Sequence, residues 1–219
     1  MTTDNTDFLH ATPFVDSDDP EILAFAEKAG GEARTLKDKA IALYGAVRDR
    51  IQYDPYRDFL DPATFRASAV LHDGKGFCVG KSALLAAVAR ASGIAARPGF
   101  ADVRNHLTSK RLQEQMGNTF YWHSYTELLV DGKWVKCTPA FDAALCERAK
   151  IKPLDFDGVN DSLFHPFDQA GRQHMEYLLD RGAFEDVPFE TIVADFKKFY
   201  PKLLAASRPG ANFRDEVTT

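Results

Sequence analysis

The clearest constraint on the fold is a hairpin signal in the second half of the chain. Two runs rich in β-branched and aromatic residues, 120–130 (FYWHSYTELLV) and 134–138 (WVKCT), flank the dipeptide Asp131-Gly132. Aspartate followed by glycine is a strong signal for the tight turn that joins two antiparallel strands. The sequence therefore predicts antiparallel sheet here, with His123 inside the first strand.

Helical patterns precede this hairpin. A helix is expected from Pro20 to Gly30, with Asp19 as its cap, and a second one from about Thr35 to Ile51. After a breaker-rich loop, residues 78–91 (CVGKSALLAAVARA) are apolar and helix-favouring. Helices followed by strands indicate an α+β fold.

The remaining segments carry weaker signals. A strand is expected at 94–101, a long charged connection with a helical piece at 102–117, and a last helix at about 189–199. With 219 residues and 45% apolar residues, the chain can form one compact domain. We expect an N-terminal arm with little regular structure at 1–19, a single catalytic domain at 20–204 and a flexible tail at 205–219.

Charge excludes some classes of partner. The 27 basic residues are outnumbered by 32 acidic ones, for a net charge of −5, and no basic block is present. A general nucleic-acid binder would carry an excess of basic residues, so we expect no nucleic-acid partner. The N-terminus lacks the features of a signal peptide, and the apolar run 83–96 is too short to span a bilayer. We expect a soluble cytoplasmic protein with no membrane association.

Cofactor motifs are absent from the sequence. The three cysteines, Cys78, Cys137 and Cys146, form neither an even disulfide framework nor a CxxC pair. The six histidines include no HExxH motif and no pair four residues apart. A P-loop and a dinucleotide fingerprint are also missing. We therefore expect neither a metal nor an organic cofactor.

Cys78 is the candidate nucleophile. It lies at the expected start of the apolar helix, directly after a glycine-containing loop. Open backbone N–H groups and the positive end of the helix dipole lower the pKa of a thiol at such a position, which favours the reactive thiolate. The same N–H groups can stabilise an oxyanion. The alternative is a small apolar cysteine that simply packs at a helix start.

His123 is the candidate base. An imidazole is a poor packing choice inside an aromatic strand unless something holds it. Strand alternation places Tyr121, His123 and Tyr125 on one face. A rigid strand suits a base that must stay within hydrogen-bond distance of a thiol. Cys78 and His123 are therefore predicted to form a thiolate–imidazolium pair, with His123 as general base and acid, although a lone histidine here could also be structural.

Two blocks of the chain resemble the transglutaminase-like superfamily. The first, residues 74–100, has a glycine-flanked cysteine that opens a helix and an R-x-x-G-I-x-A-R ending at 90–97. The second, residues 122–142, has a histidine on a strand, a turn, and a Trp-led strand that ends near Pro139. Together with Tyr53, the likeness covers about residues 50 to 142.

The resemblance implies a papain-like core with a Cys–His–Asp triad. In the superfamily the aspartate usually precedes the proline after the Trp-led strand, but this chain has Thr138 there. We hypothesise that Asp142 orients His123, with Thr138 as the rival or a supporting contact. A threonine hydroxyl can accept a hydrogen bond but cannot offset imidazolium charge. The alternative for Asp142 is that it caps the next segment, residues 143–149.

The resemblance also implies the activity. We expect a cysteine hydrolase or acyl transferase that acts on a peptide or protein substrate through a thioester, with water or an amine as acceptor. A second hypothesis is a catalytically degenerate module that binds a peptide or protein, supported by Thr138. A third is redox sensing at Cys78, for which Cys137 is the plausible resolving thiol.

Overall fold

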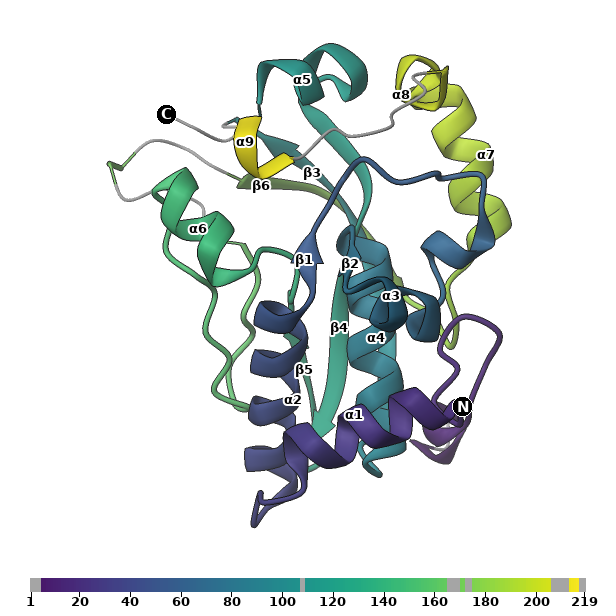
Figure 1. The fold of residues 1–219 in the computed structure, drawn as a ribbon, viewed down its shortest axis with the longest axis vertical. Helices are drawn as coiled ribbons and strands as arrows, with labels where there is room; N and C mark the ends of the chain where they lie inside the picture. Colours follow the sequence, from purple (N-terminus) through teal and green to yellow (C-terminus); the bar gives the residue numbers. More distant parts are fainter. Residues whose placement is uncertain (1–4, 107–108, 165–169, 172–174, 206–212, 217–219) are drawn as a thin grey trace.

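The protein is described here by a computed structural model (Figure 1). The structure describes residues 5–106, 109–164, 170–171, 175–205 and 213–216.

Helices of varied length make up much of the described chain. The α-helices are α1 Pro20–Gly30, α2 Leu36–Arg50, α3 Ala67–Asp73, α4 Cys78–Ala91, α5 Lys110–Met116, α6 Ala143–Ala149, α7 Phe189–Phe199, α8 Pro201–Ala205 and α9 Phe213–Glu216, with 3-10 turns η1 Asn5–Leu9 and η2 Pro62–Thr64. The strands are β1 Gln52–Tyr53, β2 Lys75–Gly76, β3 Ala96–Asn105, β4 Thr119–Val130, β5 Lys133–Cys137 and β6 Met175–Ala183.

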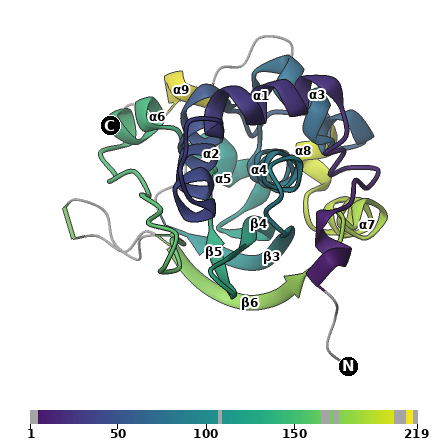
Figure 2. The same ribbon diagram turned by 90° about the horizontal axis from the view of Figure 1, so that it is seen from below.

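One antiparallel sheet forms the base of the fold. Its strand order is β5-β4-β3-β6, and each neighbouring pair is antiparallel. Figure 2 shows α4 between this curled sheet on one side and α1, α2 and α3 on the other. The short strands β1 and β2 pair in parallel and lie close to the start of α4 (Figure 1). The predicted α+β fold, with the apolar helix packed on an antiparallel sheet, is confirmed.

Burial on every side explains the composition of α4. All of its residues except the last are buried, because both layers pack on it. Even Lys81 is fully buried, and its Nζ donates to the carbonyl oxygens of Arg48 at 2.9 Å and Ile51 at 2.5 Å. These carbonyls lie at the C-terminal end of α2, where a cation is favourable. From the sheet side, the Thr126 hydroxyl donates to the Ser82 carbonyl oxygen at 3.0 Å.

Local signals in the sequence set several boundaries. Asp19 caps α1 as predicted, Thr35 caps α2 at its expected start, and α4 and α7 have the expected bounds. Asp131 and Gly132 have φ angles of 50° and 80°, the left-handed pair that a tight hairpin turn requires. The predicted hairpin is therefore confirmed.

Other expectations were wrong. β3 continues to Asn105, through residues that we assigned to a connection, because β6 pairs with it along its length. The strand β6 itself was not predicted. The described part of the N-terminal arm is also more ordered than expected, since Phe8 is buried and its ring meets that of Trp134 edge-on at 5.4 Å. Among the described residues, no helix has the length and apolar character needed to cross a membrane.

Close packing at Gly80 yields a stability prediction. A Cβ atom at Gly80 would lie 2.8 Å from the Thr64 carbonyl oxygen and 2.8 Å from a Val70 methyl carbon, whereas one at Gly45 in α2 would meet nothing within 4 Å. We predict that Gly80→Ala lowers the free energy of unfolding by about 1–3 kcal/mol through overpacking. The control Gly45→Ala should raise it by about 0.5–1 kcal/mol, since alanine favours a helix interior. Urea denaturation measures both, and a Gly80→Ala variant as stable as Gly45→Ala would contradict the packing.

Candidate active site

The thiol of Cys78 lies at the first position of α4. The preceding residue, Phe77, is extended and offers no side-chain cap, so the first-turn N–H groups of the helix are open to another acceptor. Burial raises the pKa of the Cys78 thiol to about 11, against the lowering effect of hydrogen bonds from the backbone N–H groups of Ser124, Val79 and Cys78 itself. The sulfur is therefore surrounded by donors but shielded from water.

His123 lies on β4, the strand packed against α4. Its side chain is buried, and its ring lies 4.3 Å from that of Phe164. The buried Nε2 atom has no hydrogen-bond partner among the described residues. A buried nitrogen without a partner is costly, so it is an unusual feature of a folded chain. Burial also lowers the pKa of the His123 imidazole to about 3.

Cys78 and His123 line the same pocket. The other lining residues are aromatic or apolar and come from β1 and the loop after it, from the residue before α4, and from α5, β4 and α7: Tyr53, Pro55, Phe59, Phe77, Leu112, Met116, Phe120, Tyr121, Trp122 and Phe196. The cavity measures about 30 Å³, which is room for one or two water molecules. The pocket is therefore narrow at Cys78 and His123.

Burial in this apolar pocket opposes the expected thiolate–imidazolium pair. Charged groups lose hydration energy when apolar walls surround them, so burial favours the neutral form of each. The pKa of Cys78 is accordingly raised and that of His123 lowered. For Cys78 this effect of burial acts against the hydrogen bonds from the N–H groups at the start of α4, and the ion pair stays a prediction.

Helix α9 fastens two walls of the pocket together. The Phe213 ring packs against those of Tyr53 at 5.7 Å and Tyr56 at 6.0 Å. Glu216 accepts a hydrogen bond from the Tyr56 hydroxyl and pairs with Arg111 at 2.8 Å. Since Tyr53 lines the pocket and Arg111 belongs to α5, these contacts join the loop after β1 to α5. No pattern in the sequence predicted this arrangement.

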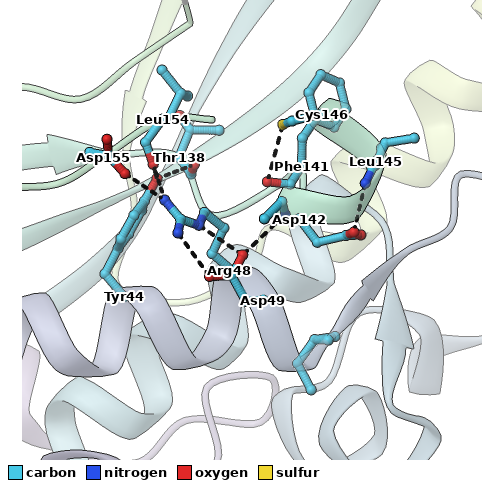
Figure 3. A network of polar contacts seen from close by, with 12 residues as sticks. Tyr44, Arg48, Asp49, Thr138, Phe141, Asp142, Leu145, Cys146, Leu154 and Asp155 are labelled. Atoms are coloured by element: carbon cyan, nitrogen blue, oxygen red, sulfur yellow. Dashed lines mark hydrogen bonds and ion pairs between the residues drawn. The ribbon is translucent and has the colours of Figure 1, made fainter. Parts of the chain in front are cut away.

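Asp142 has a structural role that Figure 3 shows in part. One carboxylate oxygen accepts the Leu145 N–H at 3.0 Å and caps α6 (Figure 3), and the other accepts the Tyr53 N–H at 3.1 Å. The alternative that Asp142 caps the following helix is thus confirmed, with the bounds expected. The carboxylate also anchors Tyr53, a wall of the pocket. Its role in orienting His123 stays a prediction.

Thr138 occupies the position where the superfamily pattern has aspartate. Its backbone is tied down on both sides, since its N–H donates to the Ser162 carbonyl oxygen at 3.0 Å and its own carbonyl oxygen accepts the Tyr44 hydroxyl at 3.1 Å. The buried side-chain hydroxyl oxygen has no partner within the described part of the chain. Thr138 therefore stays a rival for the orienting role.

The predicted alternation of side chains between the two faces of the strand was wrong at the start of β4. Trp122 has a left-handed φ of 59°, and the pairing with β3 shifts register between Ala101 and Val103. As a result, Tyr121, Trp122 and His123 all line the pocket. A positive φ at tryptophan has no sequence signal, because glycine and asparagine are the residues that usually mark it.

The segment that follows α6 contributes one contact to the site. Phe156 is buried against Tyr44, and Asp157 accepts the backbone N–H groups of the two residues 159 and 160, each at 2.8 Å. The aromatic rings of this segment therefore pack over the core while Asp157 makes a turn, and Phe164 adds the contact with His123.

One pocket is lined by a cysteine at the start of a central helix and by a histidine on the adjoining antiparallel strand. This arrangement defines a class of α+β proteins with a thiol–imidazole site. The sequence model of the transglutaminase-like superfamily matches residues 23–139. This chain belongs to that superfamily, which confirms the resemblance.

Comparison with solved structures supports the fold. A candidate cysteine protease from Cytophaga hutchinsonii superposes with a TM-score of 0.53 at 17% identity, over 85% of this chain and 48% of that one. A candidate protease from Parabacteroides distasonis gives 0.40 at 16% identity over 60% and 24% of the two chains, and a TGase gives 0.39 at 20% over 64% and 32%. The chain thus spans about half the length of the first of these. No curated protein matches it.

The buried imidazole predicts acid sensitivity. The pKa of His123 is about 3 in the folded protein and about 6.5 when unfolded, so the unfolded chain binds the proton more tightly. This contribution to stability is complete above pH 6.5 and is lost as pH falls toward 3, by up to about 1.4 kcal/mol per pH unit. Thermal unfolding against pH should show this slope in wild type and in the control His72→Asn, an exposed histidine, but not in His123→Asn. Equal slopes in all three would contradict burial of a neutral imidazole.

The two contacts of Asp142 predict a large stability loss. Asp142→Ala removes a helix cap and leaves the buried Tyr53 N–H without its acceptor, so the free energy of unfolding should fall by about 2–4 kcal/mol. Asp19→Ala removes only the cap of α1 and should cost about 1 kcal/mol. Chemical denaturation of the two variants measures the difference, and equal losses would show that the Tyr53 contact contributes nothing.

Proposed function

We propose that the protein is a cysteine-dependent hydrolase or acyl transferase that acts on amide or peptide bonds through a thioester on Cys78. The observation that carries the proposal is the buried Nε2 of His123, which has no partner among the described residues and lies in the same pocket as the Cys78 thiol. A thiol needs a base to lose its proton, and a leaving amine needs an acid to gain one. One imidazole can supply both.

The first chemical step forms the thioester. His123 Nε2 takes the thiol proton as the Cys78 sulfur attacks the carbonyl carbon of the substrate. The backbone N–H groups at the start of α4 favour negative charge on sulfur and on the developing oxyanion. His123 then gives its proton to the leaving nitrogen, the C–N bond breaks, and the acyl group stays on Cys78.

The second step releases the acyl group. Water or an amine enters the vacated space, and neutral His123 takes its proton as it attacks the thioester carbonyl. The C–S bond breaks and the proton passes to the Cys78 sulfur, which restores the thiol. The starting and final states both contain a neutral thiol and a neutral imidazole, which agrees with the pKa directions of the two groups.

The substrate is proposed to be a peptide or a protein. Superfamily membership and the protease-like fold support this class. We further propose that residues 20–204 act as a single catalytic domain. Asp142 is proposed to orient His123, with Thr138 as the rival; comparing the acylation rates of Asp142→Ala and Thr138→Val distinguishes them.

A second candidate function is a degenerate module that binds a peptide without turnover. Thr138 in the position of the usual aspartate favours it, because the hydroxyl cannot offset imidazolium charge. The apolar pocket is equally suited to an apolar side chain. The retained thiol and imidazole are not needed by such a module.

Acyl-enzyme trapping tests the proposal. We expect p-nitrophenyl acetate to release a burst of p-nitrophenolate and to leave an acetyl group on the peptide that contains Cys78, as read by mass spectrometry. Cys78→Ser should abolish the burst, and His123→Asn should lower its rate by about a hundredfold or more. The matched controls Cys137→Ser and Cys146→Ser should acylate as wild type does. A burst that survives in Cys78→Ser would refute the assignment, and absence of acylation in wild type would favour the binding module.

A further inference from the structure

The residue before His123 has a strained backbone. Trp122 has φ 59°, in the left-handed region that costs a residue with a side chain about 1–2 kcal/mol. The register between β3 and β4 shifts at the same point. Because side chains alternate along a strand, the turn at Trp122 decides on which face of the sheet the following side chain emerges. The direction of the His123 imidazole therefore depends on Trp122.

A carboxylate on β3 holds the backbone of Trp122 in this conformation. The Trp122 N–H donates to an Asp102 oxygen at 3.1 Å. Asp102 is in turn held by Arg181 of β6, whose Nε and Nη2 donate to its two oxygens at 2.6 and 2.9 Å. This is the bidentate geometry in which arginine fixes a carboxylate most rigidly. Asp102 is buried, so its charge depends on this partner.

The indole ring of Trp122 is held by the same group of residues. Its Nε1 donates to a carboxylate oxygen of Asp195, on α7, at 2.7 Å. The Arg181 guanidinium lies over the ring, 4.3 Å from its centre, and reaches the same Asp195 oxygen at 3.4 Å. Backbone and side chain of Trp122 are thus fixed together by three charged residues from three elements.

None of the steps of the proposed acyl-transfer mechanism uses these contacts. Arg181 and Asp195 lie beyond residues 23–139, the part of the chain that matches the superfamily. A buried ion pair is weak evidence for stability, since desolvation offsets much of its Coulomb energy. What the cluster does achieve is to hold a costly conformation next to the proposed base, which is where strain tends to serve function.

We propose that Asp102, Arg181 and Asp195 form a clamp on Trp122 that positions the His123 imidazole toward Cys78. These are positioning residues, and their role rests on the proposed acyl-transfer function. When the clamp is released, Trp122 relaxes toward an extended backbone and His123 turns away from the thiol. The clamp also makes β6 and α7 part of the catalytic apparatus.

The test uses acetylation of Cys78 by p-nitrophenyl acetate in the full chain. Arg181→Met keeps the aliphatic stem but removes both bonds to Asp102. It should lower the acylation rate constant by about tenfold or more, with KM changed by less than about threefold, because geometry and not binding is lost. The control Arg104→Met breaks the Arg104–Glu176 pair, which also joins β3 to β6, and should stay within about twofold of wild type.

A double variant separates positioning from general damage. If Arg181 acts through His123, adding Arg181→Met to His123→Asn should lower the remaining rate by less than about twofold. An equal tenfold loss in that background would show a merely structural role and overturn the proposal. An Arg181→Met rate equal to that of Arg104→Met would overturn it as well. If wild type and His123→Asn acylate at the same rate, the proposed function itself fails, and the clamp's catalytic role with it.

A milder variant serves if Arg181→Met does not fold, as judged by near-ultraviolet circular dichroism. Asp195→Ala leaves the Asp102–Arg181 pair intact and removes the acceptor of the indole N–H together with the longer contact of Asp195 with Arg181. Its acylation rate constant should fall by about threefold, again with little further loss in the His123→Asn background. A folded Asp195→Ala protein with the wild-type rate constant would contradict the clamp.

Discussion

The burial of α4 governs both the fold and the chemistry of this protein. The sheet packs on one side of the helix and three helices on the other, so a helix without a polar face is stable in this position. The same burial places the first turn of α4, with Cys78, inside the molecule. Lys81 is fully buried there, and its Nζ donates to carbonyl oxygens at the end of α2.

Two opposing effects act on the pKa of the buried Cys78 thiol. Backbone N–H groups at the start of α4 and on β4 favour a thiolate, but loss of water favours the neutral thiol, and the second effect is the larger. The imidazole of His123 is neutral for the same reason. In the free site both groups are therefore favoured in the neutral form from which the proposed reaction starts. The contacts of α9 with Tyr56 and Arg111 join two walls of this narrow pocket.

The sequence predicts those features that depend on neighbours in the chain. The cap at Asp19, the Asp131-Gly132 turn and the apolar run that begins at Cys78 all act over a few residues, and each is found where expected. The superfamily blocks further predicted that Cys78 and His123 would share a site, and both line one pocket.

Features that depend on distant partners could not be predicted in this way. The β6 sequence contains charges and a glycine and becomes a strand only because β3 offers its edge. Asp142 anchors Tyr53 across 89 positions of sequence, and Trp122 holds a left-handed φ through residues on β3, β6 and α7. The burial that raises the pKa of Cys78 could not be predicted either, since a helix-start motif does not reveal how deeply the helix is buried.

The most direct test of the Cys78–His123 pair is the rate of Cys78 alkylation by iodoacetamide at pH 7, located by mass spectrometry, in wild type and in His123→Asn. A thiol with a pKa of about 11 is ionised to only about one part in ten thousand at this pH, so alkylation without a base would be very slow. If His123 takes the proton, wild type should react at least about tenfold faster than His123→Asn. Equal rates in the two proteins would show that the imidazole does not serve the thiol, and the account of the site would be wrong.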